Sequence, residues 1–123
     1  MKTKSILLIF AFALLVVSAG SALADVRYVD VNSTNATPPY TNWATAATNI
    51  QDAVDAAVAS DEIVVTNGIY ATGVRLVGNP RSGTYSRVAI DKPLNVRSVN
   101  GPTVTTIDGS GAVRLWCGPA GVH

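Results

Sequence analysis

The chain has 123 residues and a formal net charge of +1, from nine basic and eight acidic side chains. A near-neutral chain with scattered arginines presents no basic patch for nucleic acid or anionic lipid, so we expect neither as a partner. A single cysteine and a single histidine exclude an internal disulfide framework and a Cys/His zinc cluster. The length suits one small domain with a modest core.

The amino terminus has the three parts of a secretory signal peptide. Two lysines precede an unbroken apolar run at 6–17, and Ala-Leu-Ala, ending at Ala24, places small residues where a signal peptidase reads them. We predict a signal peptide over 1–24, cleaved between Ala24 and Asp25. The alternative is a membrane anchor, but the apolar run is shorter than the roughly 20 residues that cross a bilayer. We therefore expect export to a periplasm, a cell surface or the medium, with no stable membrane insertion after cleavage.

Residues 25–123 are predicted to form one domain. It opens with a short strand at 26–31, because this segment is β-branched and aromatic, and continues with a loop rich in Asn, Thr and Pro. An amphipathic helix is expected over 48–59. Thr48 and Gln51 fit a capping box, and an apolar stripe follows at helical spacing. The stripe consists of Ile50, Val54, Ala57 and Val58.

After the helix the pattern changes to short extended segments separated by polar turns. We predict strands at 63–65, 69–70, 85–90, 94–98, 104–107 and 113–116, with a loop at 72–83. Such strands suit either an antiparallel sandwich or barrel, or a parallel β-helix built from stacked coils. The helix before the first short strands favours the β-helix, because a solenoid needs its open end covered.

Segments 50–57 (IQDAVDAA) and 61–70 (DEIVVTNGIY) resemble the amino-terminal part of secreted right-handed parallel β-helix proteins, the pectin-lyase-like superfamily. Segments 87–98 (RVAIDKPLNVRS) and 106–109 (TIDG) continue the likeness, which covers about Val26 to Trp116. The resemblance implies an all-β fold. The chain would be a short or truncated right-handed parallel β-helix, a solenoid with an amino-terminal capping helix at about 48–59 and coils over about 61–117.

Members of that superfamily usually have many coils and a closing element at the far end. The resemblance therefore implies that this chain is a fragment, or that its open carboxy-terminal coil pairs with a second copy or a partner chain. Enzymes of the superfamily act on uronic-acid polysaccharides through calcium-binding carboxylates and a basic residue on central coils. No catalytic residue carries over from those coils, so we expect no cofactor, with calcium belonging only to a longer parent.

Polysaccharide is the one ligand class that the side chains suggest. Trp116, Arg87 and Arg97 are candidate carbohydrate contacts, because aromatic rings stack on sugars and guanidinium groups bind anionic ones. Trp43 is a further aromatic candidate, although its place just before the helix favours packing.

Three functions stay open. The sequence favours an exported protein or fragment with a structural role and no complete active site, since it contains no grouping of nucleophile, base and orienting acid. The alternatives are the non-catalytic end of a polysaccharide lyase or glycoside hydrolase, and a cell-surface carbohydrate-binding or adhesion module.

Overall fold

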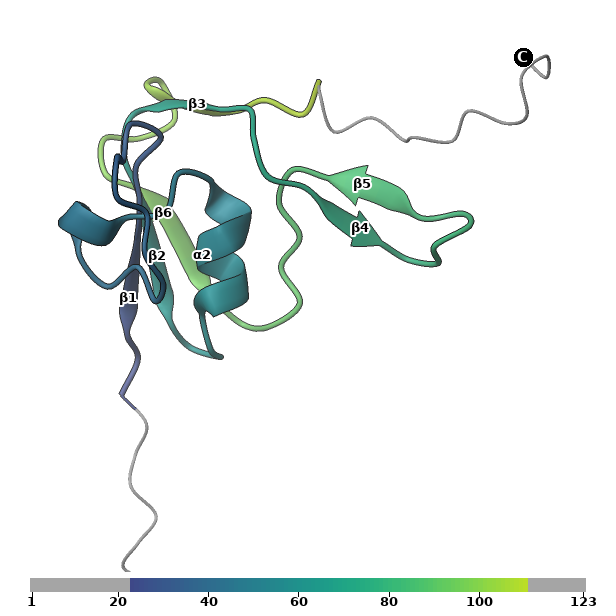
Figure 1. Ribbon diagram of the computed structural model, residues 1–123, viewed down its shortest axis with the longest axis horizontal. Helices are drawn as coiled ribbons and strands as arrows, with labels where there is room; N and C mark the ends of the chain where they lie inside the picture. Colours follow the sequence, from purple (N-terminus) through teal and green to yellow (C-terminus); the bar gives the residue numbers. More distant parts are fainter. Residues whose placement is uncertain (1–22, 111–123) are drawn as a thin grey trace, which may run out of the picture.

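The computed structural model describes residues 23–110 (Figure 1). The predicted signal peptide lies almost wholly outside these residues, as do Trp116 and the strand predicted at 113–116. The elements in chain order are β1 (Val26–Val29), a 3₁₀ turn η1 (Trp43–Thr45), α2 (Ile50–Ala56), β2 (Glu62–Val65), β3 (Gly68–Tyr70), β4 (Arg75–Val77), β5 (Thr84–Ser86), β6 (Asn95–Ser98) and β7 (Thr105–Ile107).

The strands form three small sheets. β1, β2 and β6 pair in parallel with β2 in the centre, in a register that aligns Val29 with Val65 and Val65 with Ser98. β3 and β7 form a second parallel pair, and β4 and β5 form an antiparallel hairpin that projects from the rest of the structure (Figure 1). The described residues thus contain parallel and antiparallel pairing in separate sheets.

The predicted right-handed parallel β-helix is therefore wrong. The described part of the chain forms no solenoid and no closed sheet, and the coils expected over 61–117 do not form there. One physical reason is that 75–77 and 84–86 satisfy their backbone groups against each other in a hairpin, where a stacked coil requires parallel partners. The other is the position of α2, which packs against β1 and β2 and does not close an open end.

The helix exists as predicted but is shorter than the expected 48–59. Its cap is Asn49, whose Oδ1 accepts a hydrogen bond of 2.9 Å from the Asp52 N–H, so the predicted Thr48 cap is wrong by one residue. The helix ends where Ala57 turns to an extended conformation, and the side chain of Val58 beyond it is 58 % exposed. Three of the four residues of the predicted stripe are nevertheless buried.

The core lies between α2 and one face of the first sheet. Ile63 and Val65 alternate with Val64 along β2, so they share a face with Val29 of β1. Together with Val54 of the helix they are almost fully buried in a single apolar cluster. Burial of such side chains stabilises the fold by about 1.5–3 kcal/mol each, which makes this contact the main support of the structure.

The hairpin corrects two further predictions. Segment 72–83, predicted as a loop, contains β4, and the strand predicted at 85–90 ends at Ser86. The turn between the strands starts at Asn79, whose carbonyl oxygen accepts from the Ser82 N–H at 3.1 Å, and Pro80 follows it. Proline at the second position of such a turn fixes the φ angle that the turn requires.

Candidate functional site

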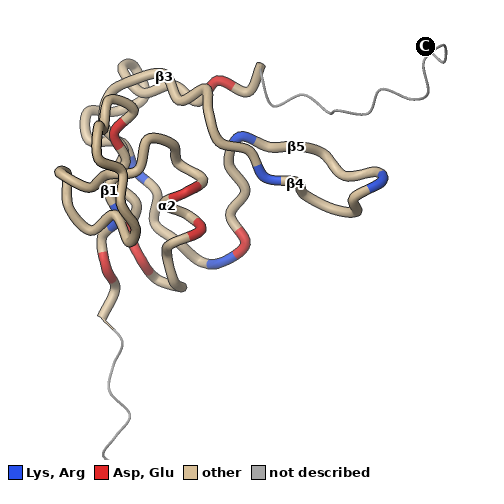
Figure 2. Tube along the Cα trace, in the orientation of Figure 1, with Lys and Arg blue, Asp and Glu red and all other residues tan. Residues whose placement is uncertain are grey.

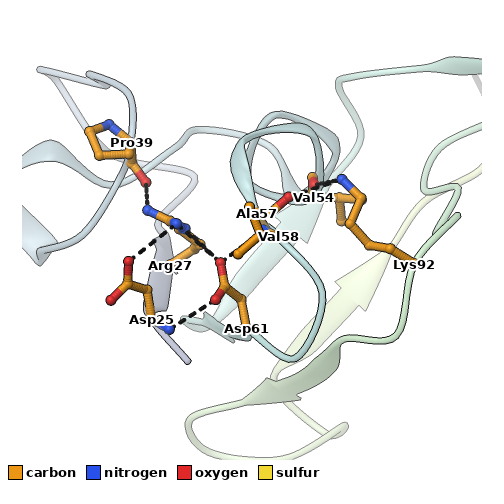
Figure 3. Close-up of polar contacts among 8 residues, drawn as sticks. All are labelled: Asp25, Arg27, Pro39, Val54, Ala57, Val58, Asp61 and Lys92. Carbon is orange, nitrogen blue, oxygen red and sulfur yellow. Dashed lines mark hydrogen bonds and ion pairs between the residues drawn. The ribbon is translucent and has the colours of Figure 1, made fainter. Parts of the chain in front are cut away.

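A buried ion pair joins Arg27 of β1 to Asp61, which lies between α2 and β2 (Figure 3). Oδ2 of Asp61, which has no exposed surface, accepts hydrogen bonds from Arg27 Nη2 at 3.0 Å and from the Val58 N–H at 2.9 Å. Oδ1 of Asp61 accepts from the backbone N–H of Asp25 at 2.9 Å. Arg27 also donates to the Pro39 carbonyl at 3.1 Å. We call Asp25, Arg27 and Asp61 the amino-terminal charge cluster.

The hydrogen bonds of this cluster favour the ionised form of Asp61. Burial is the largest single influence on the pKa of Asp61 and raises it. The N–H groups of Val58 and Asp25 and the Arg27 guanidinium act in the opposite direction and together hold the pKa below its ordinary value. Such a group stabilises the fold above its unfolded-state pKa and loses this contribution as the pH falls through the folded-state value. Acid should therefore weaken this junction once the pH falls into the lowered titration range of Asp61.

The helix is tied to the segment after the hairpin by two polar side chains. Gln51 accepts from the Ala89 N–H at 2.7 Å through Oε1 and donates to the Ala89 carbonyl at 3.3 Å through Nε2. Lys92 donates from Nζ to the carbonyls of Val54 and Ala57, each at 3.0 Å (Figure 3). A cation at these carbonyls in the last turn complements the helix dipole. Both residues therefore have structural roles.

Arg87, a predicted carbohydrate contact, is only 8 % exposed. Its Nε donates to the Asp108 carbonyl at 2.9 Å and its Nη1 to the Gly73 carbonyl at 2.7 Å. Its guanidinium thus links three segments that are distant in sequence, and this use competes with binding a sugar acid.

Arg97, the second predicted contact, lies in β6 with its side chain exposed and paired with Glu62 of β2. The structure gives Arg87 and Arg97 different partners.

Figure 2 shows acidic and basic residues interspersed around the helix, whereas 63–90 carries only basic ones. Of these, Arg75 pairs with Asp55 and Arg87 is engaged as above. The predicted contact at Trp116 falls outside the described residues and stays a prediction.

Replacing the two arginines separately should distinguish structural from surface roles. Arg87→Met should lower the free energy of unfolding by about 2 kcal/mol, because two hydrogen bonds from a charged group are lost. Arg97→Met should change it by about 0.5 kcal/mol or less, since exposed ion pairs contribute little. Chemical denaturation of both variants measures the difference. Equal effects would contradict the structural role assigned to Arg87.

A polar groove beside Trp43 is the candidate binding site. It has a volume of about 480 Å³ and lies where β1, β2 and β6 lead into their following loops. Trp43 is 44 % exposed, and its ring packs edge-on against Tyr28 with centroids 4.5 Å apart. The ring is thus fixed in position while much of it faces solvent. The groove is lined by Asp30, Asn32, Trp43, Thr66, Asn67, Val99 and Asn100.

The polar lining of the groove is partly preorganised. Asn100 Nδ2 donates to Asn67 Oδ1 at 2.8 Å, and Asp30 Oδ1 accepts from the Asn32 N–H at 2.9 Å. A half-exposed aromatic ring beside fixed amides and a carboxylate provides a stacking surface and hydrogen-bonding groups for hydroxyls. Sequence reasoning named Trp43 but missed its polar neighbours, because Asn67 and Asn100 follow different strands and meet only through parallel pairing.

A second, apolar hollow of about 210 Å³ is lined by residues of α2, β2, β6 and β7. Its apolar lining includes Ile50, Val65, Val96 and Ile107. The self-association predicted for this chain was assigned to an open coil that does not form in the described residues. Pairing with a second copy or a partner chain stays a prediction.

No group of three or more His, Cys, Asp or Glu side chains within 23–110 is arranged to hold a metal ion. Asp108, the one carboxylate in its turn, accepts instead from the Ser110 N–H at 2.9 Å, and hydrogen bonding to Ser110 lowers its pKa. In the same range no helix has the length and apolar character needed to span a membrane.

Comparison of the chain with protein-family models, with curated proteins and with solved structures gives no match. The resemblance to the pectin-lyase-like superfamily therefore stays an untested expectation from the sequence motifs.

Proposed function

We propose that this chain is an exported, non-catalytic module that binds neutral polysaccharide in the Trp43 groove. The observation that carries the proposal is Trp43, a residue that is 44 % exposed and packs on Tyr28, in a groove lined by amide and hydroxyl side chains. Asp30 gives the groove a negative charge, which disfavours uronic-acid polymers and favours uncharged ones. Export rests on the signal-peptide pattern at 1–24.

Affinity electrophoresis tests the proposal directly. Migration of the chain should be retarded in gels that contain hydroxyethyl cellulose or galactomannan, and unchanged in gels that contain polygalacturonate. Trp43→Ala should abolish the retardation, because the stacking surface is removed. Unchanged migration in both neutral gels, or retardation of the Trp43→Ala variant equal to that of the wild type, would contradict the proposal.

Two controls separate binding from folding. Trp43 packs on Tyr28, so Trp43→Phe, which keeps an aromatic contact, should retain measurable retardation. Ile90→Ala removes an apolar side chain that is 50 % exposed and does not line the groove, so it should migrate like the wild type. Denaturation curves of all the variants show whether each is folded.

A structural role, the function that the sequence favours, is the second candidate. It is supported by the internal use of several charged groups: Arg27, Asp61, Arg87 and Lys92 each tie together segments that are distant along the chain. Such a chain would act through its stability and its placement outside the cytoplasm. Failure of the gel assay together with confirmed export would favour this candidate.

A further inference from the structure

The amino-terminal charge cluster lies at the predicted cleavage site. Asp25, the first residue after that site, uses its backbone nitrogen to donate to Asp61 Oδ1 at 2.9 Å. Asp61 has no exposed surface and lies 36 residues further along the chain. The pairing of β1 with β2 begins at the same residue: the Asp25 carbonyl accepts a hydrogen bond of 2.9 Å from the Glu62 N–H, and β1 itself starts at Val26.

The two oxygens of Asp61 have separate partners. Oδ2 accepts from Arg27 and from the Val58 N–H, whereas the contact of Oδ1 within the described residues is the Asp25 nitrogen. Arg27 Nη2 also lies 3.5 Å from the Asp25 carboxylate. One guanidinium therefore serves two carboxylates, and the cluster carries a net charge of −1 while Asp25 is joined to Ala24 by an amide.

We propose that cleavage between Ala24 and Asp25 creates an ammonium group that pairs with the buried carboxylate of Asp61, so that removal of the leader completes the charge cluster. The proposal rests on the export proposed above. Signal peptidase adds water across the Ala24–Asp25 bond, which leaves a carboxylate on Ala24 and an amine on Asp25 that takes up a proton. The nitrogen keeps its position opposite Oδ1 and gains a positive charge, and the net charge of the cluster becomes zero.

The charged groups around the new ammonium determine how much cleavage stabilises the fold. Asp61 and the Asp25 side chain attract the new ammonium, Arg27 repels it, and Glu62 is engaged with Arg97 on the next strand. The amide hydrogen bond to the Asp61 carboxylate already has one ionised partner, and a positive charge on the nitrogen adds direct Coulomb attraction to it. We expect the folding equilibrium constant to be about tenfold larger for the cleaved chain.

The test compares two exported chains. One has the natural sequence, and the other has one alanine inserted between Ala24 and Asp25, so that cleavage leaves an amide at Asp25 as in the precursor. Sequencing of the amino termini verifies both ends, and urea denaturation at pH 6 and pH 9.5 measures the folding constants. The natural chain should be about tenfold more stable at pH 6. The advantage should shrink at pH 9.5, because an amine stabilised in its charged form loses that contribution as the pH rises through its pKa.

Asp61→Asn in both chains provides the matched control, since the advantage of the free amine should disappear with the carboxylate. If Asp61→Asn prevents folding, the pH dependence of the two unmutated chains decides the question. Equal stability of these chains at pH 6, or an exported chain that does not begin at Asp25, would overturn the proposal. Neither outcome affects polysaccharide binding by the Trp43 groove, which the gel assay tests separately.

Discussion

Asp61→Ala should destabilise the protein more than any other removal of a charged side chain. The variant leaves the Arg27 guanidinium buried without its carboxylate and removes the acceptor of two backbone N–H groups. Breaking a buried pair in this way costs about 3–5 kcal/mol, which approaches the total stability of a small domain. We expect a largely unfolded chain at 37 °C and neutral pH, detected by loss of the cooperative urea transition.

The dependence of the free energy of unfolding on pH below neutrality provides a second test of the cluster. Because the pKa of Asp61 is lowered in the folded state, the wild type should lose stability as the pH falls below about 4. Asp91→Ala is the matched control, since the Asp91 side chain is 75 % exposed and lies 3.7 Å from Lys92. It should change stability by about 0.5 kcal/mol or less. Similar losses for Asp61→Ala and Asp91→Ala would refute the structural role of the cluster.

Val54→Asp should unfold the protein by separating α2 from the first sheet. Val54 has no exposed surface and contacts the core formed with Val29, Ile63 and Val65. A carboxylate placed there would lie within an apolar cluster, so the variant would either hold it in the neutral form or lose the packing of the helix on the sheet. Either route costs about 4 kcal/mol or more. Circular dichroism and thermal denaturation measure the result.

Val104→Asp is the matched control for this substitution. It makes the same chemical change just before β7, at a residue that is 43 % exposed. We expect a change of about 0.5 kcal/mol or less. Near-normal thermal stability of Val54→Asp would show that the helix does not dock on β1 and β2 as described.

The parts of the fold that the sequence predicted well are those determined by local periodicity. Alternation and β-branching located β2 and β6, and the spacing of Ile50 and Val54 gave the helix and its buried face. The cap shifted from Thr48 to Asn49 because both side chains can accept a backbone hydrogen bond and the sequence does not choose between neighbours. The turn of the hairpin carries a sequence signal at Asn79-Pro80, but the strand before it was missed because 72–83 was predicted as a loop.

The candidate site was less predictable than these elements. Trp43 could be named from its residue type, but its exposure depends on Tyr28 holding the ring in place. Arg87 was expected at the surface, yet two carbonyls from distant segments bind it in the interior. Neither carbonyl carries a sequence signal, because every residue has one.

The sequence by itself located α2, β2 and β6 to within a residue or two at their amino-terminal ends, and it showed which residues are apolar and which pattern marks the amino terminus, because these features depend on neighbours within a few positions. Only the tertiary structure decided how the strands divide into three sheets, that α2 covers a sheet face, and that Arg27 and Asp61 meet in the interior. Short strands of three or four residues accept several partners, so their pairing follows from long-range packing. The same parallel pairing brings the loops after β2 and β6 together beside Trp43, and this forms the proposed polysaccharide site.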